Sequence, residues 1–327
     1  MRRRVALIAA SALVVLLAMV QTVGLLAHAL SRASPPEAGL AAVPHLLRAS
    51  DTAQRTLDPY RGPGAWVDMY DVAGDGDTAP VTPDAIDEMA DVGVRTLYLQ
   101  AARDDRQGGP AELYDPGLLG RFLVRAHQRG MQVVGWYLPR FGDVARDLAH
   151  LEAIADFEVM GHRFDGVAVD IEWTDTVPDD GERSARLVEL SQALRDTMGS
   201  GAVGAIVMPP AHLEAVNPGF WPGFPWDELA PLYDVWLPMA YWTQRSAASG
   251  YRDAASYTTD NLRRLRGHLG DDAPVHMIGG LGEDTTSGDL AAFVASSGEG
   301  GAIGASIYDW ATSSADAHQQ LSDGVGP

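Results

Sequence analysis

The chain has 327 residues, of which 46% are hydrophobic, and a formal net charge of −20. This length suits one large domain with a short leader, and the charge argues against binding nucleic acid or an anionic membrane by bulk attraction. All 24 basic residues are arginine and cysteine is absent, which excludes a Schiff-base lysine, a thiol nucleophile and a disulfide. The nine histidines lack paired metal-ligand spacing, so we expect neither a metal nor a cofactor.

The N-terminal segment predicts export. Three arginines at 2–4 precede an apolar run over 5–20, which is typical of a signal peptide, and Ala27-His28-Ala29 offers a cleavage site. If uncleaved, the run is long enough to anchor the chain in a membrane. We therefore interpret 1–30 as signal peptide or anchor, 31–63 as a linker rich in proline, alanine and serine, and 64–327 as the domain of a secreted or extracytoplasmic protein, expected to be a monomer.

Strand-like and helix-like runs alternate from residue 64 onward, which is typical of parallel βα units. The predicted strands cover 65–72, 94–101, 132–138, 164–173, 203–208, 235–241, 275–280 and 302–308. The predicted helices begin at 82 and cover 118–129, 144–160, 182–198, 226–232, 257–269, 288–295 and 315–321. Eight units of each kind predict an α/β fold, a (β/α)8 TIM barrel.

The fourth predicted strand, 164–173, carries the strongest functional signal. Read with a period of two, its valines and isoleucine point one way, whereas Ala168, Asp170 and Glu172 point the other way. This pattern fits a barrel strand whose interior face ends in carboxylates at the mouth. Two acids close together in a partly desolvated mouth raise the pKa of at least one of them, which supplies a general acid. The alternative is an ordinary strand whose terminal acids cap a loop.

This stretch resembles the D-G-x-D-x-D-x-E signature of family-18 glycoside hydrolases, the chitinases and their relatives. Asp165, Gly166, Asp170 and Glu172 match the signature, whereas Ala168 stands where the family has its first interior aspartate. The resemblance implies that Glu172 is the catalytic acid/base. It also implies that Asp170 positions the acetamide of the substrate as the nucleophile.

A second, shorter element on the sixth strand is similar to the M-x-Y-D element of the same family. Met239-Ala240-Tyr241 matches its first three positions, and Trp242 stands where the family has aspartate. The resemblance implies that Tyr241 helps to hold the acetamide. At the end of the eighth strand, Tyr308 or Trp310 could serve as the aromatic floor of the site.

The C-terminal ends of the predicted strands combine aromatic and polar residues. Aromatic rings stack on sugars, and acids and amides bind hydroxyl groups, so the mixture suits a carbohydrate. The candidate binding residues are Asp68, Tyr70, Tyr98, Gln100, Tyr137, Trp173, Met239, Trp242, Glu283, Tyr308 and Trp310. The loop 220–226 holds four aromatic residues among prolines, and it is either a platform at the edge of a cleft or packing on the outside of the barrel.

Together these features predict an exported glycoside hydrolase that acts on a polysaccharide or amino-sugar glycan. Glu172 would be the general acid/base, assisted by Asp170 and Tyr241. One alternative is a retaining glycosidase that uses Glu172 with Glu283. Another is a non-catalytic barrel that only binds carbohydrate, which an arginine pairing with Glu172, such as Arg103 or Arg140, would favour.

Overall fold

Eight parallel strands form the central sheet of the computed structural model, which describes residues 56–72, 80–104 and 112–326. They are β1 (Gly62–Val67), β2 (Thr96–Gln100), β3 (Gln132–Tyr137), β6 (Gly166–Ile171), β7 (Val203–Val207), β8 (Val235–Pro238), β9 (His276–Leu281) and β10 (Gly304–Tyr308). β10 pairs with β1, and bridges between Trp236 and Val275 and between Met239 and Ile278 join β8 to β9. The sheet is therefore a nearly closed barrel, and the predicted fold is confirmed.

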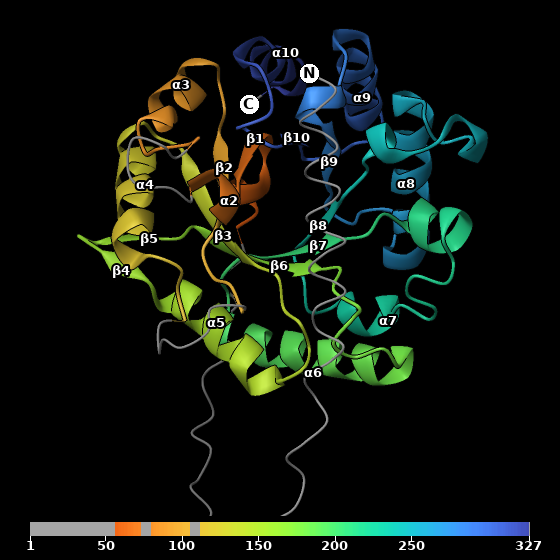
Figure 1. Ribbon diagram of the computed structural model, residues 1–327, viewed down its shortest axis with the longest axis horizontal. Helices are drawn as coiled ribbons and strands as arrows, with labels where there is room; N and C mark the ends of the chain where they lie inside the picture. The colour runs from red at the N-terminus through yellow and green to blue at the C-terminus, as the bar shows by residue number, and fades with distance from the viewer. Residues whose placement is uncertain (1–55, 73–79, 105–111, 327) are drawn as a thin grey trace, which may run out of the picture. The chain divides into compact units, whose positions relative to one another are not determined.

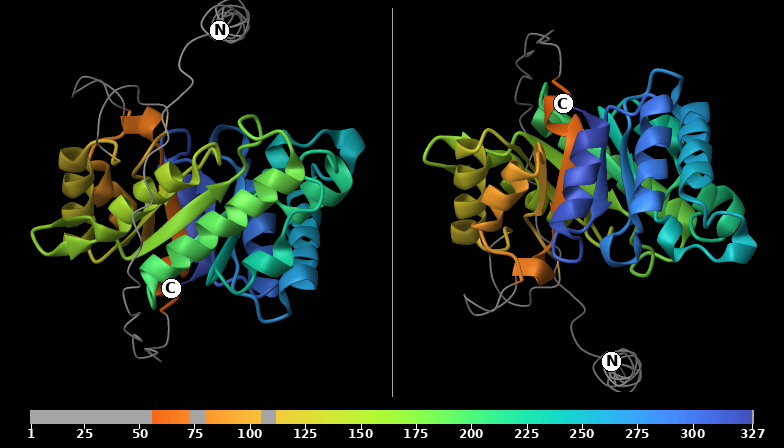
Figure 2. Two further views of the ribbon diagram at one scale, coloured as in Figure 1. Left: turned by 90° about the horizontal axis from the view of Figure 1, so that it is seen from below. Right: turned by 90° about the horizontal axis from the view of Figure 1, so that it is seen from above.

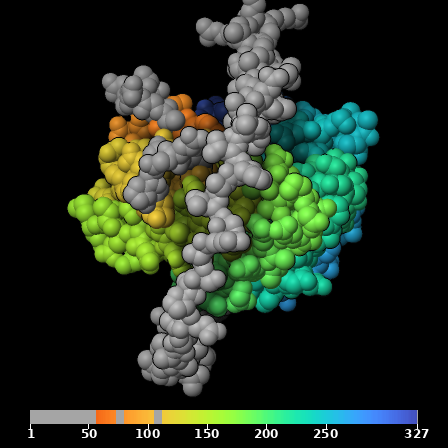
Figure 3. Space-filling view, turned by 60° about the horizontal axis from the view of Figure 1, so that its bottom comes forward, coloured from red at the N-terminus to blue at the C-terminus, as the bar shows by residue number. Residues whose placement is uncertain are grey.

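Helices surround the strands on the outside of the barrel (Figures 1 and 2). They are α3 (Ala85–Asp91), α4 (Pro116–Gln128), α5 (Val144–Asp156), α6 (Asp180–Met198), α7 (Trp226–Leu229), α8 (Ala254–Leu269), α9 (Ser287–Glu299) and α10 (Ala315–Val325). Figure 3 shows the yellow, yellow-green and green residues of the chain segment that runs from α4 to α6 on the outside of the barrel. Six of these helices begin after an aspartate, serine or threonine whose side chain accepts a backbone N–H of the first turn, as N-cap residues do.

Short turns complete the chain. They are the 3-10 turns η1 (Asp58–Tyr60), η4 (Trp242–Gln244), η5 (Ala247–Ser249) and η6 (Gly282–Asp284), and the π-helical turn η3 (His212–Val216).

Two predicted elements end at least four residues earlier than the sequence suggests. The first strand stops at Val67, and the short helix α2 (Met69–Val72) follows it. The helix predicted over 144–160 stops at Asp156, and β4 (Glu158–Val159) and β5 (His162–Arg163) form an antiparallel hairpin after it. Met160 and Gly161 form its two-residue turn with φ of 52° and 81°, the left-handed geometry that tight hairpins need.

The barrel interior is filled by an apolar cluster that is distinct from the layer under the helices. Tyr60 lies at the N-terminal end of the strands, fully buried, and its hydroxyl donates to the carbonyl of Val167 at 2.8 Å. Gly166 and Gly204 leave room for this ring, since a Cβ at either position would lie within 3 Å of it. The barrel therefore begins before the predicted boundary at residue 64, because Tyr60 is part of its core.

His276 is a fully buried titratable residue that contacts this interior cluster. Its Nδ1 lies 2.9 Å from the carbonyl oxygen of Tyr60, and its Nε2 lies 3.0 Å from the hydroxyl of Ser306. A carbonyl only accepts, so Nδ1 carries the proton and Nε2 accepts from Ser306. Burial lowers the pKa of His276 to about 4. The ring is neutral and has a structural role.

The predictions for the leader lie outside the described residues. Residues 1–55, which include the expected signal or anchor and most of the linker, are not among them. Within the described ranges, none of the helices is both long and apolar enough to span a bilayer.

A buried ion pair ties α6 to the β7–β8 edge of the barrel. The Arg195 guanidinium lies 2.7 Å from a carboxylate oxygen of Asp234, and both side chains are less than a tenth exposed. The same guanidinium donates to the carbonyl of Leu232, and the same carboxylate accepts the N–H of Val203. Breaking one side of such a pair leaves an uncompensated buried charge.

We therefore expect Arg195→Met to lower the free energy of unfolding by about 3–5 kcal/mol. Arg263→Met is the matched control, because Arg263 also pairs with an aspartate but its side chain is 66% exposed, and exposed pairs contribute about 1 kcal/mol or less. Urea unfolding followed by circular dichroism measures both variants. Equal effects of the two substitutions would contradict a structural role for the buried pair.

Candidate active site

Strand β6 carries two carboxyl groups to the C-terminal mouth of the barrel. Ala168 is fully buried in the interior cluster, and Asp170 and Glu172 follow it on the same face. The alternate residues of the strand belong to the layer under the helices. Asp170 lies on β6 and Glu172 directly follows the last residue of the strand, so the two side chains are two positions apart and point into the same space.

This pair is poorly solvated. Asp170 is 7% exposed, and its Oδ1 is buried without a hydrogen-bond partner among the described residues. Burial raises the pKa of Asp170 well above its usual value, and the nearby charge of Glu172 raises it further. Burial also raises the pKa of Glu172. The two carboxyl groups titrate as a pair, so the pair retains a bound proton at pH values above the ordinary pKa range of carboxylic acids.

Tyr241 joins this pair from the segment after β8. Its pKa is raised first by burial and then by the charges of Asp170, Glu172 and Asp309. Its ring centre lies 6.1 Å from that of Tyr308. The hydroxyl therefore remains protonated and can donate a hydrogen bond within the field of the acids, so the structure brings the three predicted catalytic residues together.

A second group of acids lies at the ends of β1 and β10. Asp68, Asp71 and Asp309 each place a carboxylate oxygen within 4.8 Å of the others. The hydroxyl of Tyr308 donates to Asp68 at 2.6 Å, and the backbone N–H of Asp68 donates to Asp71 at 3.0 Å. Burial raises the pKa of Asp71 to about 7 and also raises that of Asp309. Of the described residues, this group is the one spaced to share a cation.

The sequence reasoning missed Asp71 and Asp309. Asp309 directly follows Tyr308 at the end of the last strand. Its place at a C-terminal strand end was a signal in the sequence that could have identified it. Asp71 was assigned to an extended strand end, whereas it lies in α2 and folds back toward Asp68.

Several predicted binding residues lie at or just below the mouth. The side chain of Gln100 accepts the N–H of Met69 at 3.2 Å and so holds the start of α2. Met239 is buried in the interior cluster. Tyr70 is exposed and accepts a hydrogen bond from Arg103 at 3.3 Å, whereas Trp173 is half-buried beneath the guanidinium of Arg140.

Tyr98 does not reach the mouth. It is fully buried, its ring stacks on Trp66, and its hydroxyl lies 3.2 Å from Nδ1 of His276. The prediction that Tyr98 contacts a ligand is therefore wrong, because the side chain supports the floor from below.

Tyr137, Trp242 and Trp310 point away from the mouth, which corrects their predicted binding roles. Their rings pack against α5, α9 and α10 respectively. Neighbouring side chains along the chain point to opposite faces. Trp136, which precedes Tyr137, and Tyr241, which precedes Trp242, occupy the interior positions. Trp136 is thus a floor residue that sequence reasoning missed, although the period of two pointed to it.

Two other predicted features are peripheral. Glu283 is exposed on η6, and no interaction between it and Glu172 is present among the described residues. In the loop 220–226, Trp221, Phe224 and Trp226 are buried in the layer under the helices. This loop is packing on the outside of the barrel and does not form a platform at the mouth.

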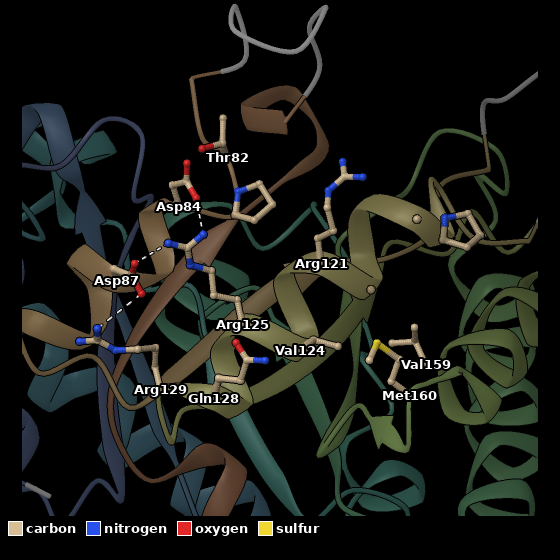
Figure 4. Close-up of a pocket in the computed structure, with 14 residues that line it drawn as sticks. Thr82, Asp84, Asp87, Arg121, Val124, Arg125, Gln128, Arg129, Val159 and Met160 are labelled. Carbon is tan, nitrogen blue, oxygen red and sulfur yellow. Dashed lines mark hydrogen bonds and ion pairs between the residues drawn. The ribbon is translucent and has the colours of Figure 1, made fainter.

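The surface also has a hollow of about 770 Å³ on the outside of the barrel, between α3, α4 and the β4–β5 hairpin (Figure 4). Arg121, Val124 and Met160 are among the residues that line it, and Arg125 pairs there with Asp84 and Asp87. None of the described residues that line the hollow is aromatic. It lacks the features of a sugar site and lies away from the carboxyl pair.

No protein-family model and no curated protein matches the chain. Among solved structures, the endo-1,4-β-mannanase from Rhizomucor miehei matches with a TM-score of 0.60 and 11% identity, over 83% of this chain and 96% of that one. The family-18 chitinase from Cycas revoluta, solved with (GlcNAc)3, matches with a TM-score of 0.59 and 13% identity, over 81% and 100%. The endo-1,4-β-D-mannanase from Thermotoga petrophila matches with 0.58 and 10%, over 76% and 88%. These likenesses show a TIM-barrel fold that this chain shares with glycoside hydrolases.

Proposed function

We propose that this protein is an exported glycoside hydrolase that acts on a polysaccharide or amino-sugar glycan, with Glu172 as its general acid/base. One observation carries the proposal: Asp170 is buried beside Glu172 at the mouth with a carboxylate oxygen that has no partner among the described residues. Such a group destabilises a fold. Keeping it is understandable if a substrate supplies the missing partner.

The chemistry follows from the protonation of the pair. Glycoside hydrolysis needs a carboxylic acid to protonate the leaving oxygen, and the raised pKa of Glu172 favours its protonated form. Asp170 would share the proton and orient either an acetamide group or another nucleophile. Tyr241 would donate a hydrogen bond near the reacting carbon.

The raised pKa of Glu172 also bears on the alternative of a barrel that only binds sugar. An arginine locked onto Glu172 would lower this pKa, whereas burial raises it. Arg140 instead stacks on Trp173 and lies 3.7 Å from Asp104. These contacts favour catalysis over binding alone.

Glu172→Gln should lower turnover by roughly 100-fold or more, because it removes a positioned proton donor while keeping the shape of the side chain. Hydrolysis of a panel of chitin, mannan and glucan oligosaccharides measures the effect, with binding measured in parallel and expected to survive. Glu283→Gln is the matched control and should retain activity. If Glu283→Gln is the inactive variant and Glu172→Gln is not, the role assigned to Glu172 is wrong.

Asp170→Asn should make the protein more stable but less active. A carboxyl whose pKa is raised by folding binds its proton more tightly in the folded state, so its contribution to stability falls as pH rises from the unfolded pKa to the folded one. Removing the group should therefore raise the melting temperature in mildly alkaline buffer by several degrees, and by less near pH 4, about the unfolded pKa of an aspartate. Asp175→Asn, on an exposed loop, is the control; a melting temperature that Asp170→Asn lowers in alkaline buffer would contradict the burial cost.

Export rests on residues 1–30 and is tested separately. A chain with a C-terminal tag should reach the outside of the cytoplasmic membrane and become accessible to added protease. Retention of a protected tag in the cytoplasm would remove the localisation from the proposal without affecting the hydrolase.

A further inference from the structure

Five carboxyl groups gather at the mouth of the barrel, and we name them the mouth acids: Asp68, Asp71, Asp170, Glu172 and Asp309. They come from the C-terminal ends of β1, β6 and β10 and from α2. Each ion pair formed between described residues involves other acids. The mouth acids are thus a concentration of carboxyl groups without a described basic partner, in a chain that has no lysine. Burial raises the pKa of Asp71, Asp170, Glu172 and Asp309, and a nearby cation would favour their ionised forms.

The mouth acids form two groups that Tyr241 links. Asp170 and Glu172 lie on one side, and Asp309 lies on the other side together with Asp68 and Asp71. The ring centre of Tyr241 lies 6.1 Å from that of Tyr308, whose hydroxyl donates to Asp68 at 2.6 Å. The charges of Asp170, Glu172 and Asp309 also raise the pKa of Tyr241. A ligand that enters the mouth and reaches Tyr241 therefore experiences the field of both groups.

Three described arginines follow strand ends at the mouth, and their described contacts are with groups other than the mouth acids. Arg245 donates to the carbonyl of Tyr241 at 3.3 Å and lies 2.6 Å from Nδ1 of His212. Arg103 lies over the ring of Tyr70 at 4.9 Å and donates to its hydroxyl. Arg140 lies over the ring of Trp173 at 4.4 Å and 3.7 Å from Asp104. These cations are engaged at the rim, which leaves the positive charge in the mouth to be supplied by a ligand.

A second observation points to a ligand that donates hydrogen bonds. The Oδ1 atom of Asp170 is buried and has no partner among the described residues, although the side chain is more than nine-tenths buried. In the ionised form of Asp170 this oxygen can only accept, so its partner must be a donor. An ammonium group offers three donors and a positive charge, and charge-assisted hydrogen bonds are about twice as strong as neutral ones. An N-acetyl group offers one N–H and no charge.

We propose that the mouth accepts glycans with protonated amino groups, such as glucosamine units, in preference to N-acetylated, neutral or anionic glycans. This inference rests on the proposed hydrolase function for the substrate class, but it makes a claim about binding alone. The ammonium groups would lie among the mouth acids, with one of them donating to Asp170. Anionic glycans would be repelled by the same charges.

The test compares two oligosaccharides of equal length, one of N-acetylglucosamine and one of glucosamine, by isothermal titration calorimetry near neutral pH. At this pH a share of the amines is protonated, and more of the mouth acids are ionised than in acidic buffer, because their pKa values are raised. The wild-type protein should bind the amino oligomer about 10-fold more tightly or better, as one charge-assisted contact allows. The preference should shrink as salt rises from about 50 mM to about 500 mM, because salt screens charge. Affinity for the acetylated oligomer should change little with salt.

Asp309→Asn should reduce the preference for the amino oligomer by about 10-fold, because it removes a charge. The amide oxygen can still accept the hydrogen bonds that Thr312 donates to Oδ1 of Asp309 at 2.9 Å, so the fold should be kept. Asp227→Asn is the matched control, since Asp227 is exposed on α7 outside the barrel. Asp227→Asn should leave the preference for the amino oligomer unchanged. The comparison separates the effect of a charge at the mouth from the effect of the net charge of the protein.

The outcomes separate this inference from the proposed function. Equal or tighter binding of the acetylated oligomer, or no binding of either, would overturn the amine preference, even if the wild-type protein hydrolyses a neutral glycan through Glu172. A salt-sensitive preference for the amino oligomer without hydrolysis of any glycan would keep the inference and remove the hydrolase. If ligand binding requires calcium or magnesium ions and is abolished by a chelator, the acids hold a metal ion and the inference is wrong.

Discussion

In a closed barrel of parallel strands, only every second side chain points into the interior. This alternation determines which functional groups reach the mouth of the barrel. The interior face of β6 passes from Gly166 through Ala168 to Asp170, so the chain goes from a tightly packed base to a charged mouth within a few residues. The lower positions must be small because Tyr60 fills the base. The upper positions are free to be polar because the barrel opens there.

Burying carboxyl groups at such a mouth costs stability, and the rest of the barrel is arranged to tolerate it. Below the mouth, His276 is satisfied by its contacts with Tyr60 and Ser306, whereas Nε1 of Trp136 has no partner among the described residues. On the outside, the Arg195–Asp234 pair has hydrogen-bonding partners on both sides. Several buried polar atoms have no partner among the described residues, and Oδ1 of Asp170 is the one carboxyl oxygen among them. Its place beside Glu172 at the mouth makes it informative about function.

Much of this architecture could be predicted from the sequence, because strand and helix periodicities are local properties. The eight strands were placed within a few residues, and the two faces of β6 were read correctly from alternation alone. Tyr137 and Trp242 were misplaced because residue type was given more weight than alternation. Asp71 was missed for a different reason: the turn that brings α2 back to Asp68 depends on hydrogen bonds between residues that the sequence pattern does not pair.

Ala168 shows how a departure from a motif can be compatible with the fold. It pairs in register with Trp136 on β3, and both side chains belong to the interior cluster. A small residue beside a large indole keeps the barrel filled where a second aspartate would have added another buried charge. With that charge absent, the negative field of the mouth is concentrated in the β6 pair and in the group at β1 and β10. These two groups lie on either side of Tyr241. The ligands that the mouth can accept therefore depend more on the charge distribution around the Tyr241 hydroxyl than on a complete D-G-x-D-x-D-x-E motif.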